Sequence, residues 1–469
     1  MTGMDDALPD NVERDEVLDE DNRLTDEFVR SVSDAVESND TNLAQDLVNP
    51  LHNADIADLF ELVDEDERAP LADALGDLVS ADVLAEMNDF VREDLIEVLD
   101  AGQIADLTEQ LDTDDAVAII EDLEDEEQRA VLAELEPEDR AVIESALTYD
   151  EETAGRIMQR DLVAVPEHMN VGNLIDYLRE HDDLTTEFWE IYVVDAAHKP
   201  MGTCQLSWIL RTPRNIPVSD VMKREQTLIP ATMDQEEVAL RFQKYDLISA
   251  AVVNADGRLV GMIPVDDILQ IVEDEASEDV LLLSGAGEGD INEPIRDSYV
   301  ARVKWLVANL ATALVASFVI SIFGAAIEQM VALAILMPIV ASIGGNAGTQ
   351  TMAVTVRALA MNELTRSNTN RIIGREFRIA LLNGGTIAVL VGIGTGLAFG
   401  NPMLGAVIAL AMLINIVIAG FAGIFVPVML DRMDQDPALA SSVFVTMITD
   451  TMGFLAFLSL AVGSGLVSL

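Results

Sequence analysis

One aspartate lies in the middle of an apolar stretch near the end of the sequence. Asp450 stands within Val445–Gly453, and a carboxylate in the middle of a membrane span costs about 2.5–3.5 kcal/mol on insertion scales. No Lys or Arg occurs at a similar depth in the neighbouring apolar stretches after residue 330. An intramembrane acid without a cationic partner marks a functional site. We therefore predict that Asp450 binds an ion; the alternative is a protonated structural aspartate bonded to a neighbouring helix.

A second apolar stretch contains residues that are unusual for a lipid-facing helix. Residues Met337–Thr351 include Pro338, three glycines, Asn346 and several hydroxyls. This composition predicts a loosened helix with free carbonyls, which is tolerated only against protein or a water-filled path. Close packing of helices through small residues is the alternative explanation.

The oxygen-rich set of side chains around Asp450 favours a hard cation. One acid per chain, with amide, hydroxyl and carbonyl oxygens, suits Mg²⁺, because this ion keeps several of its waters. A Ca²⁺ site would need more direct carboxylates. The candidate pore residues are Asp450, Asn346, Thr446, Ser442 and Gly345.

The elements that must position these residues are membrane spans. Each of five hydrophobic stretches exceeds the ~20 residues that cross a bilayer: about 303–323, 331–360, 379–400, 403–429 and 442–467. Arginines lie before the first stretch and cluster between the second and third, and Arg432 lies between the fourth and fifth. The positive-inside rule therefore places the N-terminal half in the cytoplasm and the C-terminus outside the cell membrane.

Charge divides the chain into two parts. The 469 residues carry a formal net charge of −57, yet residues 301–469 have eight basic and seven acidic residues. The first 300 residues hold the other 77 acids, which argues against nucleic acid as a partner and favours cations. Only four of the 27 basic residues in the whole chain are lysines, as in proteins adapted to the molar salt of a halophile, where surface repulsion is screened. The single cysteine, Cys204, excludes an intrachain disulfide and a cysteine-cluster metal site.

The acidic half begins with a helical region. Residues 1–40 are nearly all polar and predict a disordered tail. Residues 41–148 have apolar residues at helical spacing and an internal echo, in which Ile56–Leu59 returns as Ile104–Leu107. Short repeating helices predict a small superhelical domain.

Residues 154–272 contain a second internal repeat. Met158 and Pro166 return as Met222 and Pro230, and each copy predicts a helix (171–180 and 235–245) between short strands. The arrangement resembles a tandem CBS pair, an α/β regulatory module. That family often binds adenine nucleotides through a Ser/Thr-x-x-Asp step. Gln205 and Pro264 stand where this step has its hydroxyl, and Trp208 stands where the first copy would have the acid, which argues against a nucleotide site.

The CBS pair leads into an acidic connecting segment. Residues 265–300 begin with a predicted helix, Val265–Leu283, that is rich in acids. This helix ends at the Gly-containing segment 284–287.

Other functions fit the sequence less well. An ATP-driven pump needs a phosphate-binding loop, and no Gly-Lys pair exists anywhere in the chain. A membrane enzyme using Asp450 as a base would need an acid or nucleophile at that depth, and only threonine hydroxyls are present. A sensor with an inert anchor leaves Asp450 unexplained. A cation-coupled exchanger of divalent metals (Mg²⁺, Co²⁺ or Mn²⁺) stays open.

The order of these regions, with two motifs, resembles the MgtE family of magnesium channels over residues ~41–469. The motifs are Pro338…Gly344-Gly345-Asn346-Ala347-Gly348-Thr349-Gln350 and Asp436-Pro437-Ala438-Leu439-Ala440-Ser441…Thr449-Asp450. The resemblance implies a homodimer in the lipid bilayer with its pore on the two-fold axis, and hydrated Mg²⁺ at Asp450 with Asn346 near the ion path. Ser442 takes a pore position that is commonly an amide in relatives.

The resemblance also implies that cytoplasmic Mg²⁺ closes the pore. Ions held between acidic domains can bridge surfaces that otherwise repel each other and so bias a two-state arrangement. Our candidates for regulatory metal ligands are Asp267, Glu275 and Glu278.

Overall fold

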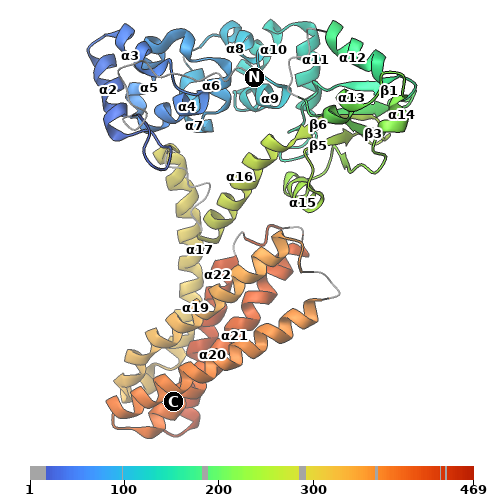
Figure 1. Cartoon of the computed structure of the whole chain (residues 1–469). Helices are drawn as coiled ribbons and strands as arrows, with labels where there is room; N and C mark the ends of the chain where they lie inside the picture. Colours follow the sequence, from blue (N-terminus) through green and yellow to red (C-terminus); the bar gives the residue numbers. More distant parts are fainter. Residues whose placement is uncertain are drawn as a thin grey trace. The chain divides into compact units, whose positions relative to one another are not determined.

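The computed structural model shows the predicted fold class: a helical domain, a tandem α/β pair, a connecting helix and a helical membrane domain (Figure 1). The structure describes residues 17–97, 99–181, 188–284, 292–364, 368–433, 435–438 and 441–468. The chain forms two compact units, Met1–Val272 and Glu273–Leu469.

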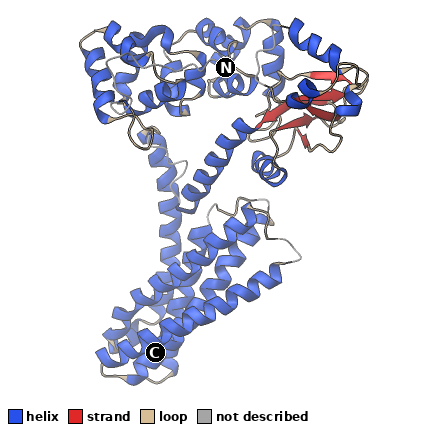
Figure 2. Cartoon of the chain, in the orientation of Figure 1, coloured by secondary structure: helices blue, strands red, loops and turns tan. Residues whose placement is uncertain are grey.

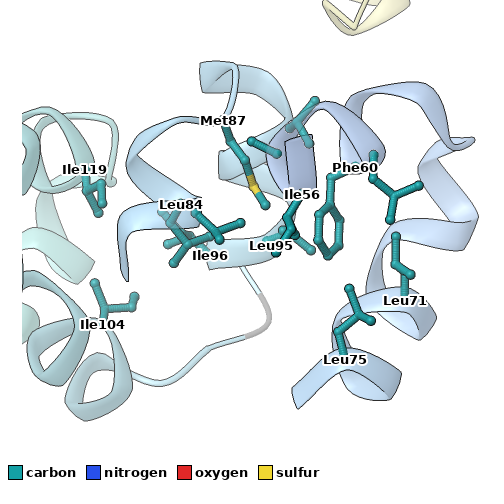
Figure 3. Close-up of a cluster of buried hydrophobic side chains, with 14 of the residues drawn as sticks. Ile56, Phe60, Leu71, Leu75, Leu84, Met87, Leu95, Ile96, Ile104 and Ile119 are labelled. Atoms are coloured by element: carbon teal, nitrogen blue, oxygen red, sulfur yellow. The ribbon is translucent and has the colours of Figure 1, made fainter. Parts of the chain in front are cut away.

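The first unit begins with short helices that stack around one apolar core (Figure 3). Many helices begin at a side chain that accepts a hydrogen bond from a backbone N–H, such as Asp40, Ser80 and Asp100. These caps define where each short helix starts. The elements are α2 (Asp26–Glu37), α3 (Thr41–Val48), α4 (Asn53–Leu62), α5 (Glu65–Leu75), η1 (Gly76–Leu78), α6 (Ala81–Ala85), α7 (Asp89–Ile96), α8 (Ala101–Thr108), α9 (Thr113–Glu121), α10 (Asp125–Glu134) and α11 (Pro137–Ala146).

The predicted disordered tail over residues 1–40 is wrong for the part that the structure describes. Helix α2 occupies Asp26–Glu37, and Thr25 caps its start. Phe28, Val32 and Ala35 recur at helical spacing and are buried in the shared core. Burial of this apolar face stabilises the helix against the repulsion of its many acids. Residues 1–16 lie outside the described residues.

Buried arginines join successive layers of the helical stack. Arg68 on α5 pairs with Asp94 on α7, and Arg92 on α7 pairs with Asp122 at the end of α9, at 2.7 Å. Both arginine residues are only 5% exposed. A buried arginine is tolerated only when its charge is paired, so these carboxylates fix how one layer sits on the next.

Two copies of a small mixed sheet follow, and they contain the strands seen in red in Figure 2. In each copy the first strand runs parallel to the second, and the second runs antiparallel to the third. The elements are β1 (Ala164–Pro166), α12 (Val171–Glu180), β2 (Glu190–Val194), β3 (Pro200–Gln205), α13 (Leu206–Arg211), α14 (Val218–Val221), β4 (Leu228–Pro230), α15 (Gln235–Tyr245), β5 (Ser249–Val253) and β6 (Leu259–Pro264). Helices α12 and α15 have the predicted bounds.

The chain segment that precedes each copy packs closely on a strand. Gln159 forms a bridge with Met262 in β6, and Lys223 forms one with Thr203 in β3. A Cβ at Gly261 would lie 2.6 Å from the Met158 sulfur and 2.8 Å from the Gln159 carbonyl oxygen. A Cβ at Gly202 would likewise lie 2.6 Å from the Lys223 carbonyl oxygen and 3.1 Å from the Met222 sulfur. The segment before the first copy therefore covers the outer strand of the second sheet, and the segment before the second copy covers the outer strand of the first sheet.

Helix α16 (Val265–Ser284) follows directly and agrees with the predicted connecting helix. Residues 285–287 of the predicted breaker lie outside the described residues. In the second unit, Leu282 and Leu283 at the end of α16 pack against an apolar cluster that includes Met352, Val356 and Val445.

Five helices among the described residues of the second unit are long and apolar enough to cross a membrane: α17 (Ile295–Ile322), α19 (Val331–Ala360), α20 (Thr369–Ala398), α21 (Pro402–Asp431) and α22 (Ser441–Gly463). A short helix, α18 (Gly324–Gln329), joins the first two. Helices α17 and α20 begin before the predicted spans, because polar turns extend them beyond their apolar parts. Helix α21 is the most buried of the five, and α17 the least.

Candidate functional site

Asp450 lies on α22 together with two other predicted pore residues. Ser442, Thr446 and Asp450 follow each other at four-residue spacing, which places them along one face of the helix. All three are partly exposed within this chain. No Lys, Arg or His of the described residues forms an ion pair with Asp450. The carboxylate therefore has no counter-charge among the described residues.

The loosening predicted for residues 337–351 is wrong. Helix α19 runs without interruption from Val331 to Ala360, through Pro338 and the glycines. Gly344 and Gly348 are buried against neighbouring helices, as in the alternative explanation of small-residue packing. Gly345 has no neighbour within 4 Å of an added Cβ, and Asn346 is exposed. The same motif therefore packs with one face and leaves its predicted pore residues on another.

A residue that the sequence analysis did not single out joins the two motif helices. Asn415 on α21 is fully buried, and its Nδ2 donates to the Val340 carbonyl oxygen at 3.0 Å. A Cβ added to Gly344 would collide with this amide, and one added to Gly453 would lie 2.6 Å from it. The sequence did contain a signal for Asn415, because its amide lies inside the most apolar of the five spans.

Asn415 also has an unmet hydrogen-bonding capacity. Its Oδ1 is buried and has no partner among the described residues, and an unsatisfied buried acceptor costs about 1–3 kcal/mol. Gly344 immediately precedes Gly345 and Asn346, whereas Gly453 follows Asp450 by three residues. One amide thus holds both motif segments at close range.

The two motif helices also touch directly. A Cβ at Gly348 on α19 would lie 2.6 Å from Val445 and 3.4 Å from Thr449 on α22. The structure therefore brings the segments that bear Asn346 and Asp450 together, and it leaves the predicted pore residues uncovered within one chain.

A second group of acids gathers in the first unit, where the start of α9 meets the start of α16. Asp114 and Asp267 interact through a hydrogen bond between their carboxyl groups, with Asp112, Asp115 and Asp266 close by. Gln159 donates from Nε2 to Asp267 Oδ2 at 3.2 Å, and Asp114 Oδ1 is buried without a partner in the part of the chain that the structure describes. Acids at helix N-termini also interact favourably with the helix dipole, which partly offsets their mutual repulsion.

Burial makes these carboxyl groups reluctant to ionise. Burial, reinforced by the charges of Asp114 and Asp112, raises the pKa of Asp115 to about 7. Burial likewise raises the pKa of Asp267 to about 7, with the charge of Asp266 adding to the effect. Burial and the neighbouring Asp267 raise the pKa of Asp114 well above its usual range. A bound divalent cation would relieve the same repulsion that protons relieve here.

The three predicted regulatory acids do not share one place. Asp267 belongs to the α9–α16 group, whereas Glu275 and Glu278 lie further along α16, by ~12 and ~16 Å at a rise of 1.5 Å per residue. Among the described residues, no three His, Cys, Asp or Glu side chains converge as a ready ligand cage. An ion at the α9–α16 group would thus keep part of its water shell, as Mg²⁺ does.

The CBS pair contains a hydrogen-bonded network that ends on an acid. Tyr192 donates to Ser249 Oγ at 2.9 Å, and Ser249 donates to Glu190 Oε2 at 3.0 Å. Burial raises the pKa of Glu190. The network therefore links β2 of the first copy to β5 of the second.

Five candidate spans with an intramembrane acid, joined to a CBS pair and an acidic helical domain, define an ion transporter with a soluble regulatory half. The family model described as the MgtE divalent cation transporter matches residues 337–460. The MgtE intracellular N domain matches residues 51–152, and the CBS domain matches residues 218–274. The chain belongs to the MgtE family.

Curated relatives agree with this assignment. The magnesium transporter MgtE of Bacillus subtilis (strain 168) is 31% identical over 322 residues, which cover 68% of this chain and 71% of the relative. The protein of the same name from Thermus thermophilus is 32% identical over 325 residues, covering 68% and 72%. The solved cytosolic domain of the Mg²⁺ channel MgtE in complex with ATP is 26% identical, with a TM-score of 0.48, over 52% of this chain and 99% of that one.

Proposed function

We propose that this protein carries Mg²⁺ across the cell membrane, with Asp450 holding the hydrated ion. The observation that carries the proposal is a membrane-span carboxylate without a cationic partner among the described residues, with Ser442 and Thr446 on the same helix face. The choice of Mg²⁺ as the ion follows from the relatives, which are named magnesium transporters. The role of the protein is ion passage, and no step of it requires covalent chemistry.

A second copy of the chain would complete the path. Asn346 is exposed, and Gly345 has open space beside it. An exposed amide and a partly exposed carboxylate are expensive against lipid. Two copies that face each other with these residues would enclose an aqueous path, so we propose a homodimer. The arginines beside and between the spans support, by the positive-inside rule, a cytoplasmic N-terminal half and a C-terminus outside.

Cytoplasmic Mg²⁺ would close this path through the acids of the soluble half. The α9–α16 group, with Asp114 and Asp267 at its centre, is the best-placed candidate, because its carboxyl groups repel each other when ionised. The end of α16 packs through Leu282 and Leu283 on the cluster that contains Val445, five residues before Asp450. A change at α16 therefore has a direct mechanical connection to α22. Glu275 and Glu278 are further candidates along this helix.

Coupled exchange of a divalent metal against another cation is the alternative. Uptake of Mg²⁺, Co²⁺ and Mn²⁺ into proteoliposomes, with and without a Na⁺ or proton gradient, separates the two. A channel passes Mg²⁺ down its own gradient at a rate that does not depend on the counter-ion gradient, whereas the rate of a coupled exchanger changes with that gradient.

The first test is Asp450→Asn, which preserves shape and removes the charge. We expect it to abolish Mg²⁺-dependent growth rescue of a transport-deficient cell and Mg²⁺ flux in proteoliposomes. The variant should still reach the membrane, because α22 packs through other residues such as Val445 and Thr449. Normal selective flux in this variant would contradict the assignment.

A further inference from the structure

A cavity with both apolar and polar side chains in its lining lies among α19, α20 and α21, and none of the predicted pore residues lines it. Its volume is about 190 Å³, and its polar lining consists of Gln350, Thr351, Asn383, Arg375 and Glu376. Gln350 belongs to the motif that contains Asn346, yet it lies on the α20 side of α19. The predicted pore residues of this motif therefore lie on one face of α19, and Gln350 lies on another.

Glu376 is the most constrained group in the cavity. Its side chain is 7% exposed, whereas that of Arg375, its partner, is 63% exposed. Arg375 Nη1 lies 2.6 Å from Glu376 Oε1. A buried carboxylate needs a counter-charge, and here that charge sits on a long side chain that reaches in from solvent.

The space beside Glu376 fits a hydrated ion. Gln350, Arg375 and Asn383 in its lining are exposed, so the cavity opens to the surface of the chain and water can enter it. At about 30 Å³ for each water, the volume corresponds to roughly six waters. One carboxylate with amide and hydroxyl oxygens is the donor set of a hard cation that keeps its waters.

We propose that this cavity is a second Mg²⁺ site, in which the hydrated ion replaces Arg375 as the partner of Glu376. The Arg375 guanidinium acts as a tethered counter-charge when the ion is absent and moves toward solvent when the ion binds. Gln350, Thr351 and Asn383 accept hydrogen bonds from the waters of the ion through their side-chain oxygens. This site does not depend on the role of Asp450.

Protection of an introduced cysteine tests the proposal in the full-length protein. The one native cysteine, Cys204, is fully buried, so a hydrophilic thiol reagent reports Thr351→Cys alone. We expect Mg²⁺ to slow labelling of this cysteine severalfold. Adding Asp450→Asn should leave the protection intact, whereas adding Glu376→Gln should remove it.

A matched pair of charge removals tests the role of Arg375. Arg375→Gln should lower the half-protecting Mg²⁺ concentration by about tenfold, which corresponds to about 1.4 kcal/mol. Arg378→Gln removes the same charge three residues away, from a side chain that is not part of the cavity lining, and should leave that concentration unchanged. If Glu376→Gln fails to fold, this pair decides the question.

Several outcomes would overturn the site. These are equal protection with and without the Glu376→Gln substitution, no protection by Mg²⁺ at all, and equal shifts from the two arginine variants. Protection that persists in Glu376→Gln but vanishes when Asp114 and Asp267 are both changed to Asn would assign the effect to the soluble half instead.

Discussion

Gly344 is a position where a single added methyl group would meet a buried polar side chain. An added Cβ would collide with the buried amide of Asn415, whereas one on the next residue, Gly345, would meet nothing within 4 Å. Two adjacent glycines therefore have different reasons to be glycine. The first permits close packing of α19 on α21, and the second lies on the face that we assign to the ion path.

This difference predicts unequal effects on stability. Gly344→Ala should lower the free energy of unfolding by about 1–3 kcal/mol, the usual range for overpacking. Gly345→Ala should leave stability unchanged, whatever it does to flux. Thermal unfolding of the solubilised protein measures both. Adding Asn415→Ala to Gly344→Ala should recover part of the loss, and similar stability of the two glycine variants would refute the packing argument.

Single residues also show where sequence reasoning reached its limit. Asp450 was found because a carboxylate in an apolar run is conspicuous. Asn415 is a weaker signal, and its importance depends on two glycines, 71 residues before it and 38 after it in the sequence. Only the packing of three helices brings Gly344, Asn415 and Gly453 together.

The acids at the starts of α9 and α16 make the free energy of unfolding depend on pH. Asp115 and Asp267 have pKa values of about 7 in the folded state, against 3.8 for an ordinary Asp. The folded state therefore binds more protons than the unfolded state between these values. The free energy of unfolding falls as pH rises from about 4 to about 7, and stability is greatest when the carboxyl groups are protonated.

Without Mg²⁺, we expect the Tm of the protein to be higher at pH 6 than at pH 8. Mg²⁺ should raise the Tm more at pH 8, because ionised carboxylates bind it and protonated ones do not. The double variant Asp115→Asn, Asp267→Asn should flatten the dependence on pH. Equal Mg²⁺ stabilisation at both pH values would argue against a metal at this group.

Helix α16 is the element that should report Mg²⁺ to the membrane domain. Changing Glu275 and Glu278 together to Gln should shift Mg²⁺ inhibition of flux to higher concentration and leave open-pore selectivity unchanged. Moving a gate from 1:99 to 99:1 needs about 5.5 kcal/mol of differential binding, so two or three bridged acids are required. Limited proteolysis in molar KCl gives the direct measurement. Equal cleavage of α16 with and without Mg²⁺ would exclude this helix.

Among the helices, the sequence predicted the bounds correctly where a single local pattern of apolar residues was clear. The bounds of α12 and α15 followed from repeated apolar patterns with clear turns. The interpretation failed for α2, because acids obscured the spacing of Phe28, Val32 and Ala35. It failed for α19 because Pro and Gly break helices in water, whereas packing and the absence of competing water keep a membrane helix intact.

At the scale of the whole molecule, we assign ion passage to the membrane spans and its control to the N-terminal half. Deleting residues 1–150 should leave Mg²⁺ flux and weaken its closure by Mg²⁺. The deletion retains the bonds that tie residues 154 and 155 to the second CBS copy, from Ala154 N to Met233 O and from Gly155 N to Ala231 O. It removes Asp114 and Asp115. Flux measured against internal Mg²⁺ gives the result, and a correctly inserted variant that conducts nothing would contradict a purely regulatory role.

The crossed packing of Met158 on Gly261 and of Met222 on Gly202 has a consequence for dissecting this protein. Each small sheet has its outer strand covered by chain from outside its own copy, at Gln159 and at Lys223. A fragment cut to the second copy alone, such as residues 218–274, would leave the edge of β6 without this cover. Bare strand edges pair with one another, so such a fragment should self-associate in solution, whereas one that starts before Met158 should remain dispersed.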